Sequence, residues 1–246
     1  MRGLILAVQF LTRLPTPQLK DFKPEWLTDS ARWFPAVGVI VGALLLASLS
    51  VGARIDPWLA ALLALVCWVA VTGGLHLDGL ADLADALGAS HRSRERFFEV
   101  LKDPHLGSFG VLSLLLAVIA KLVLLMLLAK SGQPAWGLLL IPAWARAFAV
   151  AWSASLPAIA PGSGERFAWR RDWAGMGLNL AALLALSAWL APALLLAPLA
   201  GLSWRAFLKR RLGGMTGDCL GAGVELCEIA LLAALFILPA LYPALR

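Results

Sequence analysis

Long runs of apolar residues, separated by short polar stretches, dominate the pattern of this chain. Because a helix that crosses a bilayer needs about 20 mainly apolar residues, each run of that length predicts one membrane span. Five such segments are clear: Trp33–Val51, Pro57–Leu75, Phe109–Ala129, Ala135–Leu156 and Leu220–Leu241. The shorter run Leu4–Leu11 leads straight into Arg13 and lacks a small-residue cleavage site. It therefore predicts a short helix at the membrane interface and not a signal peptide.

The segment from Met176 to Leu208 is too long for one span and short for two. Ala191-Pro192, near its middle, offers a turn, because proline lacks an amide donor and disfavours helix at the residue before it. We therefore predict a helical hairpin, which brings the total to about seven spans. The expected fold is an all-α, polytopic helical bundle in which residues 1–246 form a single integral membrane domain.

Composition supports a membrane protein. Hydrophobic residues make up 61% of the chain, charged residues only 15%, and the mean hydropathy is +0.82, whereas a soluble domain is roughly half apolar and a quarter charged. The three cysteines, Cys67, Cys219 and Cys227, lie in or beside apolar runs and are expected to be reduced thiols. The net charge of +6 includes no basic tract interleaved with aromatic residues, so no nucleic acid is expected as a partner.

The distribution of basic residues predicts the orientation, because Lys and Arg accumulate in cytoplasmic loops. With seven spans and the N-terminus inside, sixteen of the 21 basic residues lie inside, and only Arg54, Lys130 and Arg246 lie outside. The sixteen are Arg2, Arg13, Lys20, Lys23, Arg32, Arg92, Arg94, Arg96, Lys102, Arg166, Arg170, Arg171, Arg205, Lys209, Arg210 and Arg211. A single span in place of the hairpin would put the cluster at 209–211 outside, against this bias.

Acidic residues are scarce, and three of the fifteen follow the second span at helical spacing. If the helix continues, Asp78, Asp82 and Asp85 stand at i, i+4 and i+7 and share one face. Three carboxylates on one face repel each other unless a cation lies between them, and Mg²⁺ takes carboxylates together with water and phosphate oxygens. We expect Asp78 and Asp82 to be metal ligands and Asp85 to be a ligand or a neighbouring catalytic group.

A solvated acidic face that pairs with Arg92, Arg94 and Arg96 is the alternative for this cluster. The residues between the carboxylates are apolar, which favours a buried helix, where charges are costly and usually functional. His76, just before Asp78, is a metal ligand, a proton carrier or merely a polar residue at the interface.

A second acidic cluster opens the last span, after the glycine-rich segment Gly213–Gly223. Asp218 is followed by Glu225 and Glu228, which lie three residues apart and face one way. We expect all three to be metal ligands, and Thr216 in the same segment to bind substrate. The glycines allow close approach of a neighbouring helix or of a ligand phosphate. The alternative for the two glutamates is a structural ion pair with Arg146 or Lys121, the two cations that lie within spans.

Between these clusters, Lys102, Asp103 and His105 lie in the loop that leads into the third long span. Lys102 and His105 are candidates for phosphate contact, and Asp103 is a ligand or an orienting group. With His76 and Asp85 they form the predicted catalytic set. All these segments lie on the predicted cytoplasmic side, so we expect one site there.

The chain resembles the cobalamin synthase family of adenosylcobinamide-GDP ribazoletransferases almost from end to end. The resemblance is carried by Phe10–Pro15, Phe34-Pro35 with Gly38 and Gly42, Gly73–Asp85, Lys102–Gly110, Arg146, and Leu212–Glu228. It implies transfer of a phosphocobinamide group from adenosylcobinamide-GDP to the ribose 3′-hydroxyl of α-ribazole or of its 5′-phosphate. GMP leaves, adenosylcobalamin or its 5′-phosphate forms, and Mg²⁺ is required. Carboxylates that hold metal would suit such chemistry, since positioning and charge neutralisation carry most of it.

By the same resemblance the protein lies in the bacterial cytoplasmic (inner) membrane, with its active site on the cytoplasmic side. Arg13, Arg94 and Arg146 are expected to bind substrate phosphates or balance the carboxylates. Expected partners are the two substrates and the lipid bilayer. A homo-oligomer, or association with other enzymes of the corrinoid pathway, is an open alternative.

Two other classes of membrane protein are alternatives. The CDP-alcohol phosphotransferases are faintly similar, since Gly74, Asp78 and Asp82 reproduce half of their motif, but the halves overlap here in reversed order. A transporter that couples cations through intramembrane carboxylates should carry repeated halves and acidic residues near the midplane. The acidic residues here lie at one end, and no repeat is found.

Overall fold

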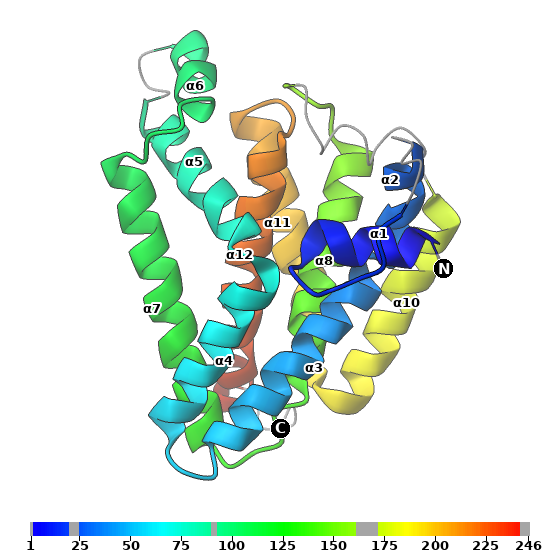
Figure 1. The fold of residues 1–246 in the computed structure, drawn as a ribbon, viewed down its shortest axis with the longest axis vertical. Helices are drawn as coiled ribbons and strands as arrows, with labels where there is room; N and C mark the ends of the chain where they lie inside the picture. The colour runs from blue at the N-terminus through cyan, green and yellow to red at the C-terminus, as the bar shows by residue number, and fades with distance from the viewer. Residues whose placement is uncertain (1, 20–24, 90–92, 161–171, 242–246) are drawn as a thin grey trace.

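The computed structural model describes residues 2–19, 25–89, 93–160 and 172–241, and within them the chain is a bundle of helices (Figure 1). The chain enters through α1 (Arg2–Leu11), α2 (Glu25–Ser30) and the 3₁₀ turn η1 (Ala31–Trp33). There follow α3 (Phe34–Gly52), α4 (Pro57–Thr72), α5 (Leu75–Ala89), α6 (Arg94–Leu101), α7 (Ser108–Lys130), α8 (Gly137–Ser155), α10 (Trp173–Leu190), η2 (Pro192–Leu196), α11 (Ala197–Arg211) and α12 (Gly217–Leu241). The predicted all-α class is confirmed, and α1 is the predicted short N-terminal helix.

Helix α8 lies at the centre of the bundle and packs against α3, α10 and α12. Its close contact with α3 depends on two glycines. A Cβ atom at Gly38 would lie 2.4 Å from the Cα of Ala143, and one at Gly42 would lie 2.4 Å from the carbonyl oxygen of Leu139. The two backbones therefore touch, as small residues allow in membrane helix packing.

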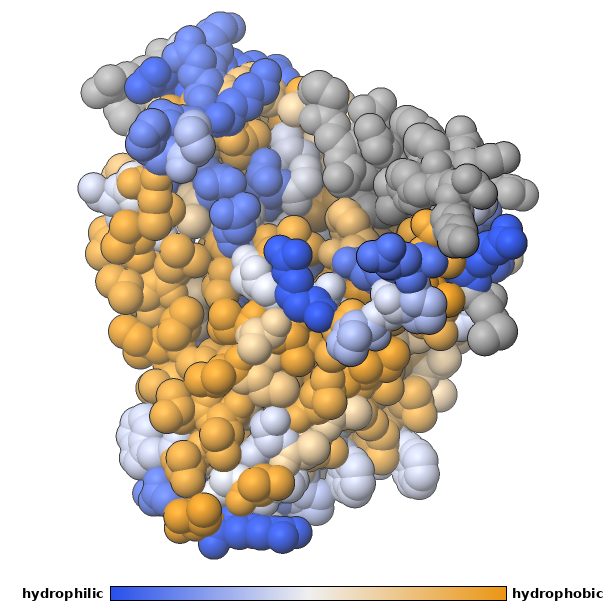
Figure 2. Space-filling model, in the orientation of Figure 1, coloured by the Kyte–Doolittle hydropathy of each residue, from blue (hydrophilic) through white to orange (hydrophobic). Residues whose placement is uncertain are grey.

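The outer surface is apolar over most of its height. On the face shown in Figure 2, hydrophobic residues form a broad band, while hydrophilic residues gather over α6 at one end, around α1, and at the α3–α4 turn at the other end. Leu112, Leu115, Leu116 and Ile119 on α7 are all more than half exposed. Such a surface is unfavourable in water and suits contact with lipid.

Within the described residues, five helices are long and apolar enough to cross a membrane, and a sixth span results if α4 and α5 count as one bent span. The predicted hairpin turn is present, because α10 ends at Leu190 and Pro192 begins η2. Helix α11 has only 15 residues and ends in Lys209, Arg210 and Arg211, so it does not qualify by length and composition. The total of seven spans and the orientation therefore stay predictions.

Helix α5 does not continue the second predicted span. Helix α4 ends at Thr72, Gly73 and Gly74 adopt left-handed φ angles of 63° and 72°, and α5 leaves at 85° to α4. A residue with a Cβ adopts such angles at a cost, so the glycine pair is what permits the bend. The helix therefore does not continue straight on from the second predicted span, but Asp78, Asp82 and Asp85 do share the single helix α5.

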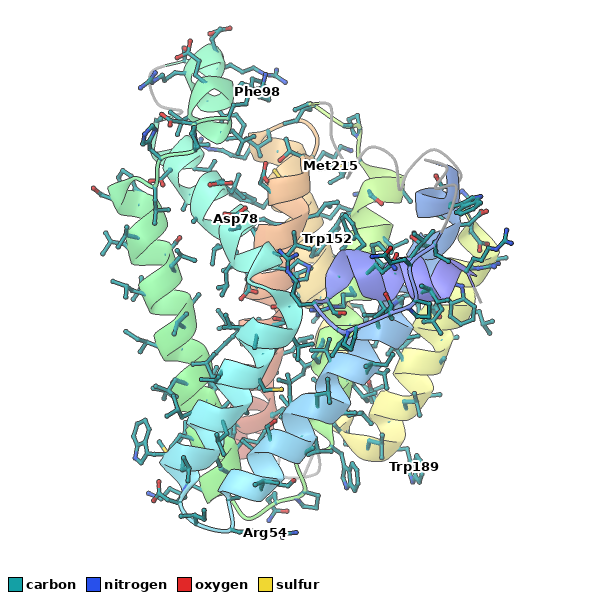
Figure 3. All side chains as sticks on the ribbon, in the orientation of Figure 1. Arg54, Asp78, Phe98, Trp152, Trp189 and Met215 are labelled. Carbon is teal, nitrogen blue, oxygen red and sulfur yellow. The ribbon has the colours of Figure 1, made fainter. Side chains whose placement is uncertain are left out.

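The three cysteines are free thiols, as predicted. Several basic residues used for the orientation lie outside the described residues: Lys20, Lys23, Arg92, Arg166, Arg170, Arg171 and Arg246. In Figure 3, Arg54 and Trp189 mark one end of the bundle, while Phe98 and Met215 lie towards the other.

Candidate active site

The two acidic segments meet where α5 crosses α12. A Cβ atom at Gly79 would lie 3.0 Å from the Cα of Asp218, and one at Gly221 would lie 3.4 Å from the Cα of His76. A glycine on each helix thus lets the two backbones approach. Close approach of a neighbouring helix is one of the two uses that the sequence left open for the glycines of the second acidic segment. In Figure 3, Asp78 lies in the space between α5 and α12.

A cavity of about 350 Å³ opens at this crossing, between α1, α3, α5, α6, α8 and α12. Six of the predicted site residues line it: His76, Asp78, Lys102, Arg146, Thr216 and Asp218. The other eight, which are Arg13, Asp82, Asp85, Arg94, Asp103, His105, Glu225 and Glu228, are not part of its lining.

Asp78, Asp82 and Asp218 form an acidic group beside the cavity. Asp78 is exposed and the other two are half-buried. Asp82 experiences the like charges of Asp78 and Asp218. No ion pair joins any of the three to a basic residue in the part of the chain that the structure describes.

The acidic group has the chemistry of a divalent-cation site, since carboxylate oxygens are the ligands that Mg²⁺ prefers. As the side chains of the described residues stand, however, no three His, Cys, Asp or Glu residues are grouped closely enough to hold a metal ion. The donor type fits Mg²⁺, and the metal roles of Asp78, Asp82 and Asp218 stay predictions.

Thr216 is placed by the start of α12. Its hydroxyl oxygen accepts a hydrogen bond from the backbone N–H of Cys219 at 3.3 Å, and its O–H donates to Asp218 Oδ2 at 3.4 Å. The first contact is that of a helix N-cap. Thr216 is only 4% exposed, so this capping residue also orients Asp218 at the cavity wall.

Asp85 is engaged by the backbone of the loop before α7. Its carboxylate accepts hydrogen bonds from the N–H groups of Gly107 and Gly110, both at 2.8 Å. It therefore caps the N-terminus of α7 from outside and fixes the end of the loop that carries Lys102. This contact gives Asp85 a positioning role that its sequence spacing did not indicate, and its predicted catalytic role stays a prediction.

Asp103 and His105 form an exposed pair in that loop. Asp103 Oδ1 lies 2.7 Å from His105 Nδ1 and accepts a hydrogen bond from the His105 backbone N–H at 3.0 Å. These hydrogen bonds to the ionised form lower the pKa of Asp103 below its ordinary value. Lys102 is the C-terminal cap of α6 and contributes to the cavity wall.

Below the cavity lies a buried ion-pair group made of Lys121, Arg146, Glu225 and Glu228. Lys121 Nζ is 2.7 Å from Glu225 Oε2 and 2.6 Å from Glu228 Oε2, and Arg146 Nη1 is 2.7 Å from Glu228 Oε1. All four residues are at most 4% exposed. The ion pairs that the sequence offered as the alternative are therefore present. The metal role predicted for the two glutamates stays a prediction, and both carboxylates have cationic partners.

Two predicted substrate-binding arginines lie away from the cavity lining. Arg13 lies over the bend between α4 and α5, where its side chain occupies the space that a Cβ atom on Gly73 would need. The guanidinium of Arg94 lies 5.9 Å from the ring centre of Phe98. Both arginines are exposed.

The apolar part of the cavity wall was not predicted. Phe10 and Phe34 stack with ring centres 6.0 Å apart, and both line the cavity, as does Phe98 on α6. Phe10 and Phe34 lie in the segments that carried the family resemblance, yet an aromatic residue next to an apolar run gives no sign of which side it faces. Phe97 next to Phe98 illustrates this, because it is 2% exposed and packs in the core.

Comparison with known proteins assigns the family. Residues 3–236 match the family described as cobalamin-5-phosphate synthase. The chain belongs to this family. The adenosylcobinamide-GDP ribazoletransferase of Laribacter hongkongensis is 64% identical over 94% of this chain and 95% of that protein. The ribazoletransferases of Thiobacillus denitrificans and Brevibacillus brevis are 52% and 34% identical, over 94% and 96% of this chain and 94% and 98% of theirs.

No solved structure matches the chain. The match to the cobalamin-5-phosphate synthase family covers α1 through most of α12, and so includes every element that lines the cavity. The resemblance identified from the motifs is thereby confirmed over almost the whole chain.

Proposed function

We propose that this chain catalyses the reaction for which its relatives are named, as an adenosylcobinamide-GDP ribazoletransferase in the assembly of the cobalamin nucleotide loop. The phosphocobinamide group passes from adenosylcobinamide-GDP to the ribose 3′-hydroxyl of α-ribazole or its 5′-phosphate, and GMP leaves. The observation that carries the proposal is family membership over residues 3–236, together with identity of 64% to a ribazoletransferase over 94% of this chain and 95% of that protein.

The cavity supports this chemistry because acidic and basic side chains line it together. The carboxylates of Asp78 and Asp218 and the cationic side chains of Lys102 and Arg146 line one space. A diphosphate substrate carries charge that needs both: basic groups bind its oxygens, and carboxylates hold a cation that neutralises them. Phe10, Phe34 and Phe98 add apolar surface suited to a large ring system.

In this proposal Asp78, Asp82 and Asp218 hold Mg²⁺. What supports the assignment is that the three carboxylates repel one another and have no basic partner among the described residues, so a cation relieves an unfavourable charge. When bound, Mg²⁺ supplies charge neutralisation and orientation at the diphosphate. Thr216 orients Asp218 through its hydroxyl, as described above.

The remaining predicted residues take roles that follow from their positions. Lys102 and His76, in the cavity wall, contact the reacting groups, and Asp85 fixes the loop that carries Lys102. His105, oriented by Asp103, lies outside the cavity lining and stays a candidate for phosphate contact at the surface. Arg13 and Arg94 lie outside the lining, and exposed basic groups there would attract the anionic substrates.

We further propose seven membrane passages, with the N-terminus and the cavity on the cytoplasmic side of the bacterial inner membrane. The break at Ala191 and Pro192 supports seven, because it separates residues 192–211, which end in three basic residues, from α10. Labelling of single cysteines from one side of the membrane tests this, with Arg94→Cys expected to react from the cytoplasm and Lys130→Cys from outside. The reverse pattern would overturn the orientation.

The test of the proposed reaction uses the full chain, purified in detergent or reconstituted in lipid. Incubation with adenosylcobinamide-GDP, α-ribazole 5′-phosphate and Mg²⁺ should release GMP and form adenosylcobalamin 5′-phosphate in equal amounts. GMP release without the corrinoid product, or no turnover with either acceptor, would contradict the proposal. Chelation of the metal should stop turnover, and added Mg²⁺ should restore it.

A further inference from the structure

The floor of the cavity carries an arginine with one edge in use and one edge without a partner. Arg146 Nη1 donates to Glu228 Oε1 at 2.7 Å and to the carbonyl oxygen of Pro142 at 3.0 Å. Its Nε and Nη2 are buried and have no hydrogen-bond partner among the residues that the structure describes. The residue is 0% exposed and lines the cavity.

Unsatisfied guanidinium donors are costly at such a position. Buried polar groups almost always find partners, and a charged group in the apolar interior of a membrane protein is costlier still without one. On the Nε–Nη2 edge two N–H groups point in the same direction, which matches two oxygens of a phosphoryl or carboxyl group. His76 Nδ1, in the same wall, is likewise buried and without a partner in the described chain.

We infer that the Nε–Nη2 edge of Arg146 is a bidentate subsite for a substrate phosphoryl group, separate from the acidic group that is proposed to hold the metal. This inference rests on the proposed function for the identity of the ligand. The phosphoryl group has two sources: the diphosphate of the donor and the 5′-phosphate of the acceptor.

The other three members of the ion-pair group then act as positioning residues for Arg146. Glu228 holds Nη1 and so fixes the plane of the guanidinium, while Lys121 bridges Glu228 and Glu225. Lys121 is itself held 4.0 Å from the ring centre of Trp68. With two cations and two carboxylates, the group is balanced in charge before a ligand arrives. Its free hydrogen-bond donors, and not a surplus of charge, are what bind the ligand.

Arg146→Lys is the direct test, because lysine keeps the charge but loses the planar edge. Steady-state kinetics with the full chain and Mg²⁺ would compare α-ribazole, α-ribazole 5′-phosphate and adenosylcobinamide-GDP. If the edge binds the acceptor phosphate, KM for α-ribazole 5′-phosphate rises about 10- to 100-fold, the loss typical of charge-assisted hydrogen bonds, while KM for α-ribazole does not change. If it binds the donor diphosphate, KM for adenosylcobinamide-GDP rises by that factor with either acceptor.

A second variant leaves the ion pairs intact, in case Arg146→Lys does not fold. Ala149→Leu adds apolar bulk to the cavity wall, on the same face of α8 and about one turn from Arg146. It should raise the same KM. Arg205→Lys is the matched control, since Arg205 on α11 hydrogen-bonds Ser155 and does not line the cavity. It should leave every KM unchanged.

The inference would be overturned if Arg146→Lys and Ala149→Leu both kept every KM within twofold of the value for the unsubstituted chain, even if their thermal stability falls. A readout without turnover separates this outcome from failure of the proposed function. Inorganic pyrophosphate binding, measured by calorimetry without Mg²⁺, should weaken at least tenfold in Arg146→Lys. Equal affinity in the two proteins would count against the subsite whether or not the chain is a ribazoletransferase.

Discussion

Two groups of carboxylates lie close together in this protein and have opposite surroundings. Asp78, Asp82 and Asp218 are partly exposed beside the cavity and have no basic partner in the described chain, whereas Glu225 and Glu228 are buried against Lys121 and Arg146. In the sequence the two look alike, as acidic residues at helical spacing among apolar ones. Helical spacing places carboxylates on one face, while the neighbouring helix decides which groups balance their charge.

The energetic consequences differ as well. In the acidic group the folded protein keeps like charges near one another, an unfavourable arrangement that a bound cation would turn into a favourable one. In the ion-pair group the attraction offsets the cost of burial, and removal of one partner leaves a charge uncompensated. Substitutions in the acidic group should therefore change catalysis, and substitutions in the ion-pair group should change stability, with Arg146 also affecting substrate binding.

The largest expected effect is the loss of turnover in the acidic group. Asp82→Asn keeps the size of the side chain and removes its charge. Turnover should fall on the order of 10²- to 10³-fold, as when a main electrostatic contribution to a transition state is removed. Thermal stability should not fall, since the substitution removes repulsion from Asp78 and Asp218. GMP release and thermal unfolding of the same preparation would measure both.

Asp56→Asn is the matched control for that substitution. Asp56 caps the start of α4, and asparagine caps helices as well as aspartate. Normal turnover and unchanged dependence on Mg²⁺ concentration in Asp82→Asn would remove this residue from the metal site.

The second prediction concerns Glu228, the centre of the ion-pair group. Glu228→Ala leaves Arg146 and Lys121 without this partner in a buried site, where loss of one partner costs about 3–5 kcal/mol. The variant should unfold at markedly lower temperature, measured by loss of helical circular dichroism in detergent. A variant of unchanged stability that has lost its Mg²⁺ dependence would instead favour the predicted metal role of Glu228.

Much of the fold was predictable from the sequence because membrane burial acts on single helices. The apolar runs, the hairpin turn at Pro192 and the all-α class each depend on local composition. The bend at Gly73 and Gly74 was missed, since two glycines indicate that the backbone can adopt many φ and ψ angles but do not indicate the angle between the two helices. In the site, the glycines of α5 and α12 allow the two helices to approach closely, but the sequence does not show that these two helices pair.

The site residues divide in the same way. Asp78 and Asp218 were identified by residue type, and the structure adds that both line one cavity. The hydrogen bonds of Asp85 to Gly107 and Gly110 join residues 22 and 25 positions apart, and no periodic pattern indicates such a contact. Partners that come from other helices are set by tertiary packing, which a single sequence does not contain.

The third prediction concerns Asp85, which belongs to neither group although it follows the acidic residues in the sequence. Asp85→Ala removes the acceptor for two backbone N–H groups at the start of α7, and loss of such a cap costs about 1–2 kcal/mol. Turnover should fall less than in Asp82→Asn, because only the position of the Lys102 loop changes. Asp85→Asn, which keeps one carbonyl acceptor, should recover part of the stability. A loss of turnover in Asp85→Asn as large as in Asp82→Asn would instead indicate a metal ligand.

The smallest effect is expected at the exposed pair of Asp103 and His105, which has neither the repulsion of the acidic group nor the burial of the ion-pair group. The hydrogen bonds from His105 lower the pKa of Asp103. A carboxyl group with a lowered pKa in the folded state stabilises the protein above its ordinary pKa of about 3.9, and this contribution disappears as the pH falls through the folded-state pKa. His105→Ala removes the side-chain hydrogen bond and keeps the backbone one, so it should raise the pKa of Asp103 part of the way towards its ordinary value, as followed by carbon NMR of the labelled side chain. Thermal stability at neutral pH should stay nearly the same, because exposed pairs are screened by solvent. Arg96→Ala, which breaks the exposed pair with Glu99, is the matched comparison for thermal stability only, because the charge of Arg96 also contributes to the lowered pKa of Asp103. If His105→Ala left the pKa of Asp103 unchanged, the side-chain hydrogen bond would not be a cause of the lowered pKa, and the proposed orientation of His105 by Asp103 would lose its support.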